Sequence, residues 1–356
     1  MKIDLYAKYA ELRRNWFQLC CTLSIGLIGS LLFVYLNLPL PWMLGSLFTT
    51  TCAAMMGQQI WVPDWLRILS LLILGALFGT TISPELLDVF VDWVPSIIAV
   101  TAYVLIVIPP TMLYLVKVVK LDAITAYFAS APGGLLPMTF IGKEMGGDAK
   151  IISLIQSSRI ILTVLIIPIS YALFAGYVPS EKIGTGSSFA SLDLGGGLIL
   201  LTVSILGFAI VRPLKIPTPS LMGPMIAVSF ISLVGFKFAE VPDLLVAIAQ
   251  CLIGSSIGIM FNDVKPRTVA RILFHGSLTS IFMIIFAVGS AAITCYLTNI
   301  PTKALILAFA PGGFAEMALV GFALGIDVAF VVTHQLTRYF FVILVLPVIF
   351  RAFNNN

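Results

Sequence analysis

Two stretches of this sequence share one unusual pattern. Ser130–Asp148 reads SAPGGLLPMTFIGKEMGGD, and Phe309–Asp327 reads FAPGGFAEMALVGFALGID. Each contains Ala-Pro-Gly-Gly, followed by Met, Gly, Gly and Asp at the same distances. When residues 126–159 are aligned on residues 305–338, 11 of the 34 positions are identical, among them a Gln and an Arg. Chance similarity between apolar stretches rarely keeps Pro, Asp, Gln and Arg in register, so the sequence predicts an internal duplication.

The composition is that of an integral membrane protein. Of the 356 residues, 60% are apolar and 10% are charged, whereas a soluble domain carries about 25% charged residues. Apolar stretches of the roughly 20 residues that a spanning helix needs recur along the chain. The basic residues before the first stretch are Lys2, Lys8, Arg13 and Arg14. No small-residue cleavage site follows that stretch, so we expect an uncleaved first span and a cytoplasmic N-terminus in an inner membrane.

Each copy of the duplication contains five apolar stretches and one Ala-Pro-Gly-Gly segment. The expected spans are 17–36, 40–58, 66–83, 94–116, 151–174, 195–212, 218–236, 244–262, 272–297 and 328–350. If the segment between the fourth and fifth spans enters and leaves the bilayer on one side, the copies are inverted and 15 of the 20 Lys and Arg residues are cytoplasmic. If it crosses the bilayer, 11 are cytoplasmic. Because Lys and Arg favour the cytoplasmic side, the charges favour the re-entrant arrangement.

The predicted fold class is an all-α polytopic membrane protein. It has two inverted repeats of five transmembrane helices, each with a re-entrant hairpin between its fourth and fifth helix, so ten helices cross the membrane. The predicted segments are a cytoplasmic N-terminal segment (1–16), a first membrane repeat (17–175), a linker (176–194), a second membrane repeat (195–351) and a tail (352–356).

The Pro-Gly-Gly breaks form the first candidate site. Pro and Gly interrupt a helix and free backbone groups that lipid cannot satisfy. Transporters use such unwound backbone to hold substrate and ions at the interface of their repeats, and a helix that begins after Gly-Gly directs several N–H groups at one point. The alternative is a kink or close helix packing. Because the break occurs twice, we expect the tips to line a substrate site. The tip residues are Pro132, Gly133, Gly134, Pro311, Gly312 and Gly313.

Two arginines are expected near the middle of the bilayer. Arg159 and Arg338 each lie eleven residues after the Asp of their copy, Asp148 or Asp327. At about 1.5 Å per residue, this places them roughly 16 Å into a core about 30 Å thick. An arginine at that depth is costly and marks a pathway or ligand site, and its planar fork suits a carboxylate or a phosphate. The alternative is an internal salt bridge or a link to a hairpin carbonyl.

Two further residue pairs accompany the arginines. Gln156 and Gln335 lie three residues before them on the same helix face, and we expect these amides to orient the substrate. Asp148 and Asp327 stand at the start of the following helix, where an Asp is usually an N-cap. The alternative for these carboxylates is a role in binding Na⁺ or H⁺.

The two copies differ at two ionisable positions. Glu316 stands where the first copy has Pro137, inside the second hairpin, and His334 stands where the first copy has Ile155. His334 lies four residues before Arg338 and therefore on the same helix. Together they are candidates for a proton relay or for selecting the substrate, whereas each alone would more often be a structural hydrogen-bonding residue.

The sequence predicts no metal centre, no cofactor and no enzyme. The five cysteines have no metal-type spacing, and the two histidines are isolated. A copper or iron monooxygenase would need a cluster of His and carboxylate ligands. No basic groove or DNA-binding helix is present in the sequence, so nucleic acid is not expected as a partner. Na⁺ is the candidate ion.

The repeated pattern APGG…M…G…GxD…Q..R covers nearly the whole chain and resembles the duplicated AbrB family of bacterial inner-membrane proteins. AFAPGGFAEMALVG, residues 308–321, is its most specific part. The layout is also similar to that of 2-hydroxycarboxylate and sodium/glutamate symporters, which implies an elevator-like bundle moving against a dimeric scaffold. The third glycine of their tip motif falls on Leu136 and Ala315 here, so their substrates are not carried over.

These observations predict a secondary transporter of a small organic anion, of carboxylate or amino-acid type, with Na⁺ or H⁺ as the candidate coupling ion. We expect a homodimer in the lipid bilayer. The first alternative is a membrane sensor or regulator of gene expression that acts through a ligand or partner without transport. Further alternatives are a membrane enzyme, which would carry bound metal, and a channel, whose flux would not saturate with substrate.

Overall fold

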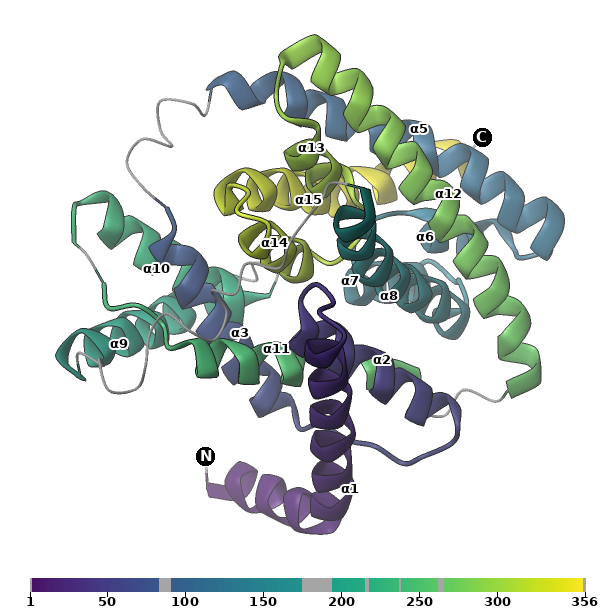
Figure 1. Cartoon of the computed structure of the whole chain (residues 1–356). Coiled ribbons are helices and arrows are strands. Elements are labelled where there is room, and N and C mark those ends of the chain that lie inside the picture. The colour runs from purple at the N-terminus through teal and green to yellow at the C-terminus, as the bar shows by residue number, and fades with distance from the viewer. Residues whose placement is uncertain are drawn as a thin grey trace. The chain divides into compact units, whose positions relative to one another are not determined.

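The structure is a computed structural model that describes residues 2–82, 91–174, 194–214, 218–236, 238–261 and 266–354. Within these ranges the chain forms fourteen α-helices and no strand (Figure 1). The all-α prediction is therefore confirmed. The predicted linker lies outside the described residues except for Leu194, as do the last two residues of the predicted tail.

Six helical segments are long and apolar enough to cross a membrane. Among the described residues they are Asn15–Tyr35, Val91–Val119, Ala149–Leu173, Gly195–Leu214, Arg271–Thr298 and Val328–Phe350. They coincide with the first, fourth and fifth predicted spans of each copy. The second and third predicted spans are helices of 15 to 17 residues, about 22–26 Å long, which is shorter than a core of about 30 Å. In the described ranges, six of the ten predicted spans are thus long apolar helices, and the other four are shorter helices.

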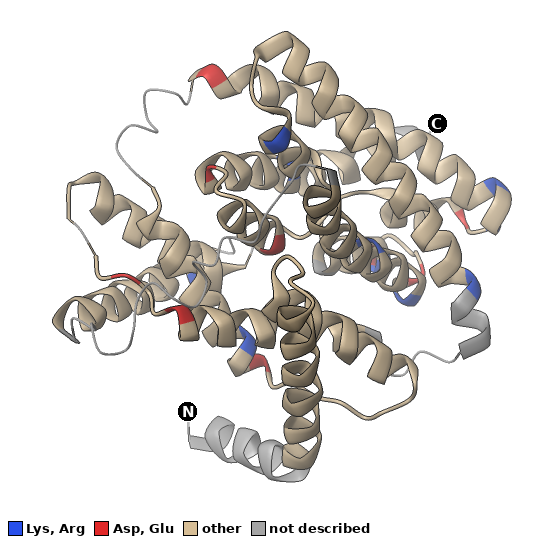
Figure 2. Ribbon diagram, in the orientation of Figure 1, with Lys and Arg blue, Asp and Glu red and all other residues tan. Residues whose placement is uncertain are grey.

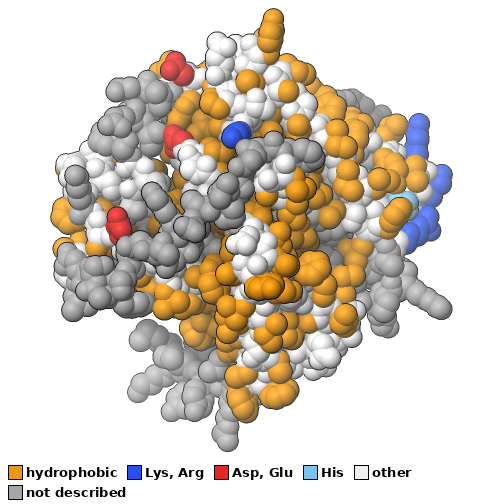
Figure 3. Space-filling view, viewed as in Figure 1, with side chains coloured by type: hydrophobic (Ala, Val, Ile, Leu, Met, Phe, Trp, Pro, Cys, Tyr) orange, Lys and Arg blue, Asp and Glu red, His pale blue; other side chains and the backbone are white. Residues whose placement is uncertain are grey.

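Large apolar side chains are exposed on the surface of this protein. Ile28, Ile106 and Phe230 expose 66%, 56% and 68% of their surface. Figure 3 shows apolar side chains over much of the face in view, and Figure 2 shows how few charged positions interrupt the helices. Water disfavours such surface by about 25 cal/mol per Å². Together with the long apolar helices, this surface makes the chain a multi-pass membrane protein.

The chain divides into two compact units, and each unit takes helices from both copies. The first unit comprises Met1–Pro84 and Pro168–Val264, and the second comprises Glu85–Ile167 and Lys265–Asn356. The first three helices of each copy therefore belong to the first unit. The later helices, with both Pro-Gly-Gly breaks, belong to the second unit.

The first unit pairs the second helix of each copy with the third helix of the other copy. Its helices are α1 (Lys2–Tyr35), α2 (Pro41–Met55), α3 (Asp64–Thr80), α9 (Leu194–Val211), α10 (Pro219–Leu233) and α11 (Asp243–Gly258). Helix α2 packs against α1 and α11, and helix α10 packs against α9 and α3. The second helix of each copy therefore contacts its own first helix and the third helix of the other copy. Helix α1 also includes most of the predicted N-terminal segment, since it begins at Lys2.

Matched glycines allow close contact between the first two helices of each copy. A Cβ on Gly45 of α2 would lie 2.3 Å from the carbonyl oxygen of Gly29 in α1. In the second copy, a Cβ on Gly223 of α10 would lie 2.6 Å from the carbonyl oxygen of Gly207 in α9. Small residues let membrane helices approach to backbone contact. Both copies thus pack their first two helices by the same means, which supports the duplication.

The second unit holds the broken helices. It contains α5 (Val94–Tyr114), α6 (Ala123–Ser130), α7 (Leu135–Glu144), α8 (Ala149–Phe174, up to residue 167), α12 (Pro266–Thr298), α13 (Thr302–Phe309), α14 (Phe314–Ala323) and α15 (Val328–Asn354). The long helices α5 and α12 pack side by side (Figure 1). Each Pro-Gly-Gly segment separates a helix of 8 residues from a helix of 10 residues. At about 12–15 Å each, these helices are too short to cross a bilayer alone.

Candidate functional site

In the first copy, the chain leaves the helical conformation directly after α6. Ala131 is extended, with φ −76° and ψ 124°, and the buried residues Pro132 and Gly133 follow. Helix α7 begins after Gly134, whose φ of +92° is a conformation that glycine adopts without strain. The break therefore frees the carbonyl groups at the end of α6 for other hydrogen-bond donors.

The second copy breaks at the matching position with a different conformation. Ala310 is extended, with φ −52° and ψ 128°. Pro311 is buried, whereas Gly312 is partly exposed. Helix α14 begins after Gly313, whose φ of −72° does not require glycine. The two tips thus share their position but differ at their second glycine.

Gln156 and Arg159 of α8 hold the first break. Gln156 Nε2 donates to the carbonyl oxygens of Phe128 (2.8 Å) and Ala131 (2.9 Å). Arg159 Nη1 donates to the carbonyl oxygen of Ala131 (3.0 Å), and its Nε donates to that of Pro311 in the second break (3.0 Å). Gln156 is fully buried and Arg159 is 3% exposed. One guanidinium group therefore joins both breaks.

Gln335 of α15 holds the second break in the same way. Its Nε2 contacts the carbonyl oxygens of Leu307 (2.6 Å), Ala308 (3.4 Å) and Ala310 (3.2 Å). Its Oε1 accepts a hydrogen bond from Nη2 of Arg338, three residues along the helix (2.5 Å). The predicted sharing of one helix face by Gln and Arg is therefore present as a direct contact.

Arg338 surrounds the second break with donors. Nη1 donates to the carbonyl oxygens of Phe309 (3.3 Å) and Ala310, and Nη2 donates to that of Gly312 (2.9 Å). The side chain is 3% exposed. Of the two predicted alternatives to ligand binding, the link to hairpin carbonyls is thus present in both copies.

Each tip also packs against the long helix of the other copy. A Cβ on Gly133 would lie 2.1 Å from Cγ1 of Val342 in α15. A Cβ on Gly312 would lie 3.1 Å from Cγ2 of Thr163 in α8. Thr163 and Val342 are matching positions, 179 residues apart. The two breaks and the two long helices therefore form one interlocked core.

The hydrogen bonds described above for the two guanidinium groups of this core have neutral acceptors. In the described ranges, all these bonds end on carbonyl oxygens or on an amide oxygen. Arg159 and Arg338 interact electrostatically with each other and with Tyr103 of α5. The Tyr103 hydroxyl donates to the carbonyl oxygen of Met283 in α12 (3.3 Å). Two like charges in a buried site are unfavourable, so this arrangement favours an anion beside them.

Three buried polar atoms of the same core have no hydrogen-bond partner among the described residues. They are Gln156 Oε1, Thr163 Oγ1 and Arg338 Nε. Each such group costs about 1–3 kcal/mol. Native structures keep few of them, and water, ions or ligands often supply the missing partner.

Asp148 and Asp327 both act as N-caps. In each case Oδ1 accepts hydrogen bonds from the N–H groups two and three residues further on, at 2.8 and 3.2 Å for Asp148 and at 2.8 and 3.4 Å for Asp327. Asp122 similarly accepts from Thr125 N (2.8 Å) at the start of α6. Burial raises the pKa of Asp122, but its hydrogen bonds to Thr125 and to nearby backbone outweigh burial, and the pKa lies below its usual value.

Glu316 folds back over the second tip. A Cβ on Gly313 would lie 2.0 Å from Glu316 Oε2. Glu316 is the third residue of α14, a position from which a carboxylate stabilises the first N–H groups of a helix. Helix α7 has no acidic residue in its first turn, since Pro137 takes the matching position. The two tips therefore differ in charge as well as in conformation.

His334 is fully buried and bonded through both ring nitrogens. Nδ1 contacts the carbonyl oxygen of Phe330 (2.8 Å), and Nε2 contacts Oγ of Ser96 near the start of α5 (2.8 Å). Ser96 Oγ also lies 2.8 Å from the carbonyl oxygen of Trp93, to which it donates. His334 thus connects α15 to α5, which is the structural role weighed for it above.

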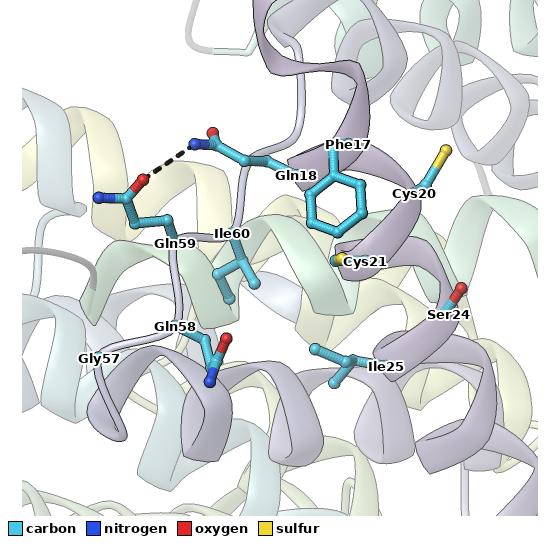
Figure 4. Close-up of a pocket in the computed structure, with 10 residues that line it drawn as sticks. All are labelled: Phe17, Gln18, Cys20, Cys21, Ser24, Ile25, Gly57, Gln58, Gln59 and Ile60. Carbon is cyan, nitrogen blue, oxygen red and sulfur yellow. Dashed lines mark hydrogen bonds between the residues drawn. The ribbon is translucent and has the colours of Figure 1, made fainter.

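Metal-binding residue types do not cluster in the described ranges, and a cavity lies in the first unit. Among the described residues, no three His, Cys, Asp or Glu residues could together hold a metal ion. A cavity of about 730 Å³ lies in the first unit beside α1, where Gln18 Nε2 donates to Gln59 Oε1 (3.2 Å; Figure 4). None of the ten described residues that line it is charged.

The structure brings the predicted Gln–Arg pairs and both tips together, but adds two residues that the sequence analysis missed. Tyr103 carries no signal in the sequence. Thr163 does carry a signal, because the first copy has Thr where the second copy has Val. Comparing the two copies in this way had already identified Glu316 and His334. The two Asp residues stand apart from this core, at the starts of α8 and α15.

The fold and the site define a polytopic helical membrane protein whose two copies each contribute a broken helix pair and a buried Gln–Arg pair. The chain belongs to the family described as "Transition state regulatory protein AbrB", whose profile matches residues 42–354. The predicted family is therefore confirmed.

Two relatives are similar to this chain over nearly its whole length. "Uncharacterized protein YhjN" of Bacillus subtilis (strain 168) is 29% identical over 372 residues, which cover 97% of this chain and 94% of the relative. "Putative regulator AbrB" of Escherichia coli (strain K12) is 23% identical over 348 residues, which cover 95% and 96%. Because so much of the chain is covered, the similarity extends over both copies.

Proposed function

We propose that this protein is a secondary transporter of a small organic anion, a carboxylate or an amino acid, coupled to Na⁺ or H⁺. The observation that carries the proposal is the buried pair Arg159 and Arg338 at the two helix breaks, whose hydrogen bonds described above end on carbonyl and amide oxygens. An anion beside them would form charge-assisted hydrogen bonds. It would also relieve the repulsion between the two cations.

The proposed architecture has inverted copies, with α6–α7 and α13–α14 as re-entrant hairpins from opposite sides. Broken helices at membrane depth are tolerated where protein or a wet cavity satisfies their backbone, and the Gln and Arg side chains supply such bonds. Transporters of this kind bind substrate between broken helices near the midplane. The second unit would carry the anion in an elevator-like movement, and the first unit would serve as scaffold in a homodimer.

The proposal assigns the remaining predicted residues as follows. Glu316, at the second tip, is the main candidate for carrying a coupling proton. His334 is a second candidate, and Asp148 and Asp327 are candidates for Na⁺ in addition to their capping role. We propose an inner-membrane location with a cytoplasmic N-terminus, and neither catalysis, a cofactor nor a nucleic-acid partner.

Flux measurements in proteoliposomes test this proposal. Uptake of labelled malate, citrate, glutamate and phosphate would be followed with and without gradients of Na⁺ or H⁺, against liposomes that lack the protein. Arg159→Lys and Arg338→Lys keep the charge but lose the fork that contacts several acceptors. We expect each to lower uptake about tenfold or more, which corresponds to about 1.4 kcal/mol.

The control is Arg212→Gln, because Arg212 is an exposed arginine of the first unit. It should leave uptake unchanged. Size-exclusion chromatography would establish that each variant is folded. Normal uptake in both lysine variants would contradict the assignment of the arginines.

A second candidate function is a membrane sensor or regulator that binds an anion or a partner without moving it. Two observations favour it: Arg159 hydrogen-bonds both breaks, which could hold the tips in one arrangement, and one relative is named as a regulator. A ligand that binds only the folded state raises the melting temperature. Stabilisation by one anion without flux would favour this function over transport.

A further inference from the structure

The hydroxyl of Thr163 differs from most others in the spanning helices. Threonines in helices usually bond to the carbonyl oxygen four residues earlier, as Thr111, Thr202, Thr294, Thr298 and Thr337 do here. Thr163 is 0% exposed, and its Oγ1 has no partner among the described residues. Its methyl group faces Gly312 of the second tip. The Thr163 hydroxyl therefore does not make the usual hydrogen bond to its own helix, at the point where α8 meets the break.

The surroundings of Thr163 are rich in donors. Arg159 lies one turn earlier on the same helix face and donates to the carbonyl oxygen of Pro311. Arg338 donates to that of Gly312, and its Nε is a second buried donor without a partner in the described ranges. Pro311 and Gly312 thus accept hydrogen bonds from two guanidinium groups, and Gly312 also contacts the side chain of Thr163. Donors without acceptors call for a ligand with several oxygen acceptors, such as a carboxylate.

The matching position in the other copy has no such chemistry. Val342 stands where Thr163 would be repeated, and it fills the space against Gly133, where a Cβ would lie 2.1 Å from its Cγ1. The first tip is therefore closed by an apolar contact. At the second tip the Thr163 methyl group makes the matching contact with Gly312, but Thr163 adds a buried hydroxyl group that valine lacks. The two tips of the core are therefore chemically unequal.

We infer that Thr163 is a specificity-determining residue of the anion site, and that its Oγ1 donates a hydrogen bond to a carboxylate oxygen of the anion at the second tip. The inference rests on the proposed function and refines it, because it centres the site on Pro311–Gly312 instead of dividing it equally between the tips. It also identifies α8 of the first copy as the helix whose side chain contacts the ligand and selects it.

Cysteine labelling tests the inference without knowledge of the natural ligand. In a variant whose five cysteines are replaced by serine, Thr163→Cys and, separately, Val342→Cys would be exposed in proteoliposomes to the anionic reagent 2-sulfonatoethyl methanethiosulfonate and to its cationic trimethylammonium counterpart. The labelling rate of each variant would be divided by the rate at which the same reagent reacts with the free thiol 2-mercaptoethanol. Fields of buried cations raise the local concentration of anions.

We expect the normalised rate at Thr163→Cys to be at least about tenfold higher for the anionic reagent, and Val342→Cys to react slowly with both. Equal rates for the two reagents, or labelling of Thr163→Cys no faster than that of Val342→Cys, would overturn the inference. Flux that continues despite such a result would leave the transport proposal standing, so the two failures are distinguishable.

A second pair of variants separates ligand contact from packing. Thr163→Val keeps the shape and removes the hydroxyl, whereas Thr163→Ser keeps the hydroxyl. If the hydroxyl binds the anion, Thr163→Val should raise KM about tenfold for an anion that the unaltered protein transports. The melting temperature of this variant without ligand should be equal to or higher than that of the unaltered protein. Thr163→Ser should retain most of the affinity. An unchanged KM in Thr163→Val would contradict the inference.

Discussion

The two glutamines of the core offer a matched test of how the breaks are held. Gln335→Met and Gln156→Met remove the same amide from equivalent positions, and Met keeps the unbranched shape of the side chain. The structure predicts unequal effects. Gln335 donates to carbonyls of its break and accepts from Arg338, whereas Gln156 donates to two carbonyls and has an Oε1 without a partner among the described residues.

The expected magnitudes follow from these bonds. A hydrogen bond between membrane helices contributes about 0.6 kcal/mol on average, and one to a charged group about 1.5–3 kcal/mol. Gln335→Met loses about two hydrogen bonds to carbonyl groups and one hydrogen bond from the charged Arg338, so it should lower the free energy of unfolding by about 3–4 kcal/mol. Gln156→Met loses about 1.2 kcal/mol but removes an unsatisfied oxygen that costs about 1–3 kcal/mol. Its net effect should be near zero or stabilising.

Thermal unfolding in detergent would measure the difference. One kcal/mol corresponds to about 2–4 °C for a unit of 150–250 residues, so the two midpoints should differ by about 6 °C or more. Gln250→Met is the control, because both amide atoms of this fully buried residue lack partners among the described residues, and it should raise the midpoint. Equal losses in the two copies, or a larger loss in Gln156→Met, would refute the reasoning.

Three other predictions concern packing, caps and metal. Gly45→Ala should destabilise the protein by about 1–3 kcal/mol, because the new Cβ would lie 2.3 Å from the carbonyl oxygen of Gly29. Gly289→Ala, where nothing described lies within 4 Å, should instead stabilise the protein by about 0.5–1 kcal/mol. Chemical unfolding would measure both changes. Asp148→Ala and Asp327→Ala should each lower the free energy of unfolding by about 1 kcal/mol through the loss of an N-cap. Asn at either position should restore most of that stability in the same assay. A loss of Na⁺-dependent uptake that Asn does not restore would instead indicate that the carboxylate is an ion ligand. Incubation with a chelator should leave the melting temperature unchanged, since no group of metal ligands occurs among the described residues, and a lowered midpoint would contradict this.

The lengths of the helices illustrate what hydropathy can and cannot predict. The apolar stretch 40–58 predicted a span of that length, but α2 ends at Met55. Gly57, with φ +82°, ends it by the left-handed C-cap that glycine favours, and Gly235, with φ +94°, ends α10 in the same way. Hydropathy follows composition alone, so it extended both helices across glycines that stop them.

The sequence by itself determined the features that depend on residues close along the chain. The duplicated motif, the helices, the breaks and the common face of each Gln–Arg pair all follow from local spacing, and the structure contains the helices, the breaks and the Gln–Arg contacts. A hairpin carbonyl was one expected partner of the arginines, but the particular carbonyl groups could not be predicted, because every residue carries a carbonyl group and only a break in a helix leaves one free. Only the tertiary structure decided that Arg159 donates to Pro311, 152 residues away, and that Thr163 faces one tip while Val342 closes the other. Such choices depend on which helices pack together, which is a property of the whole chain.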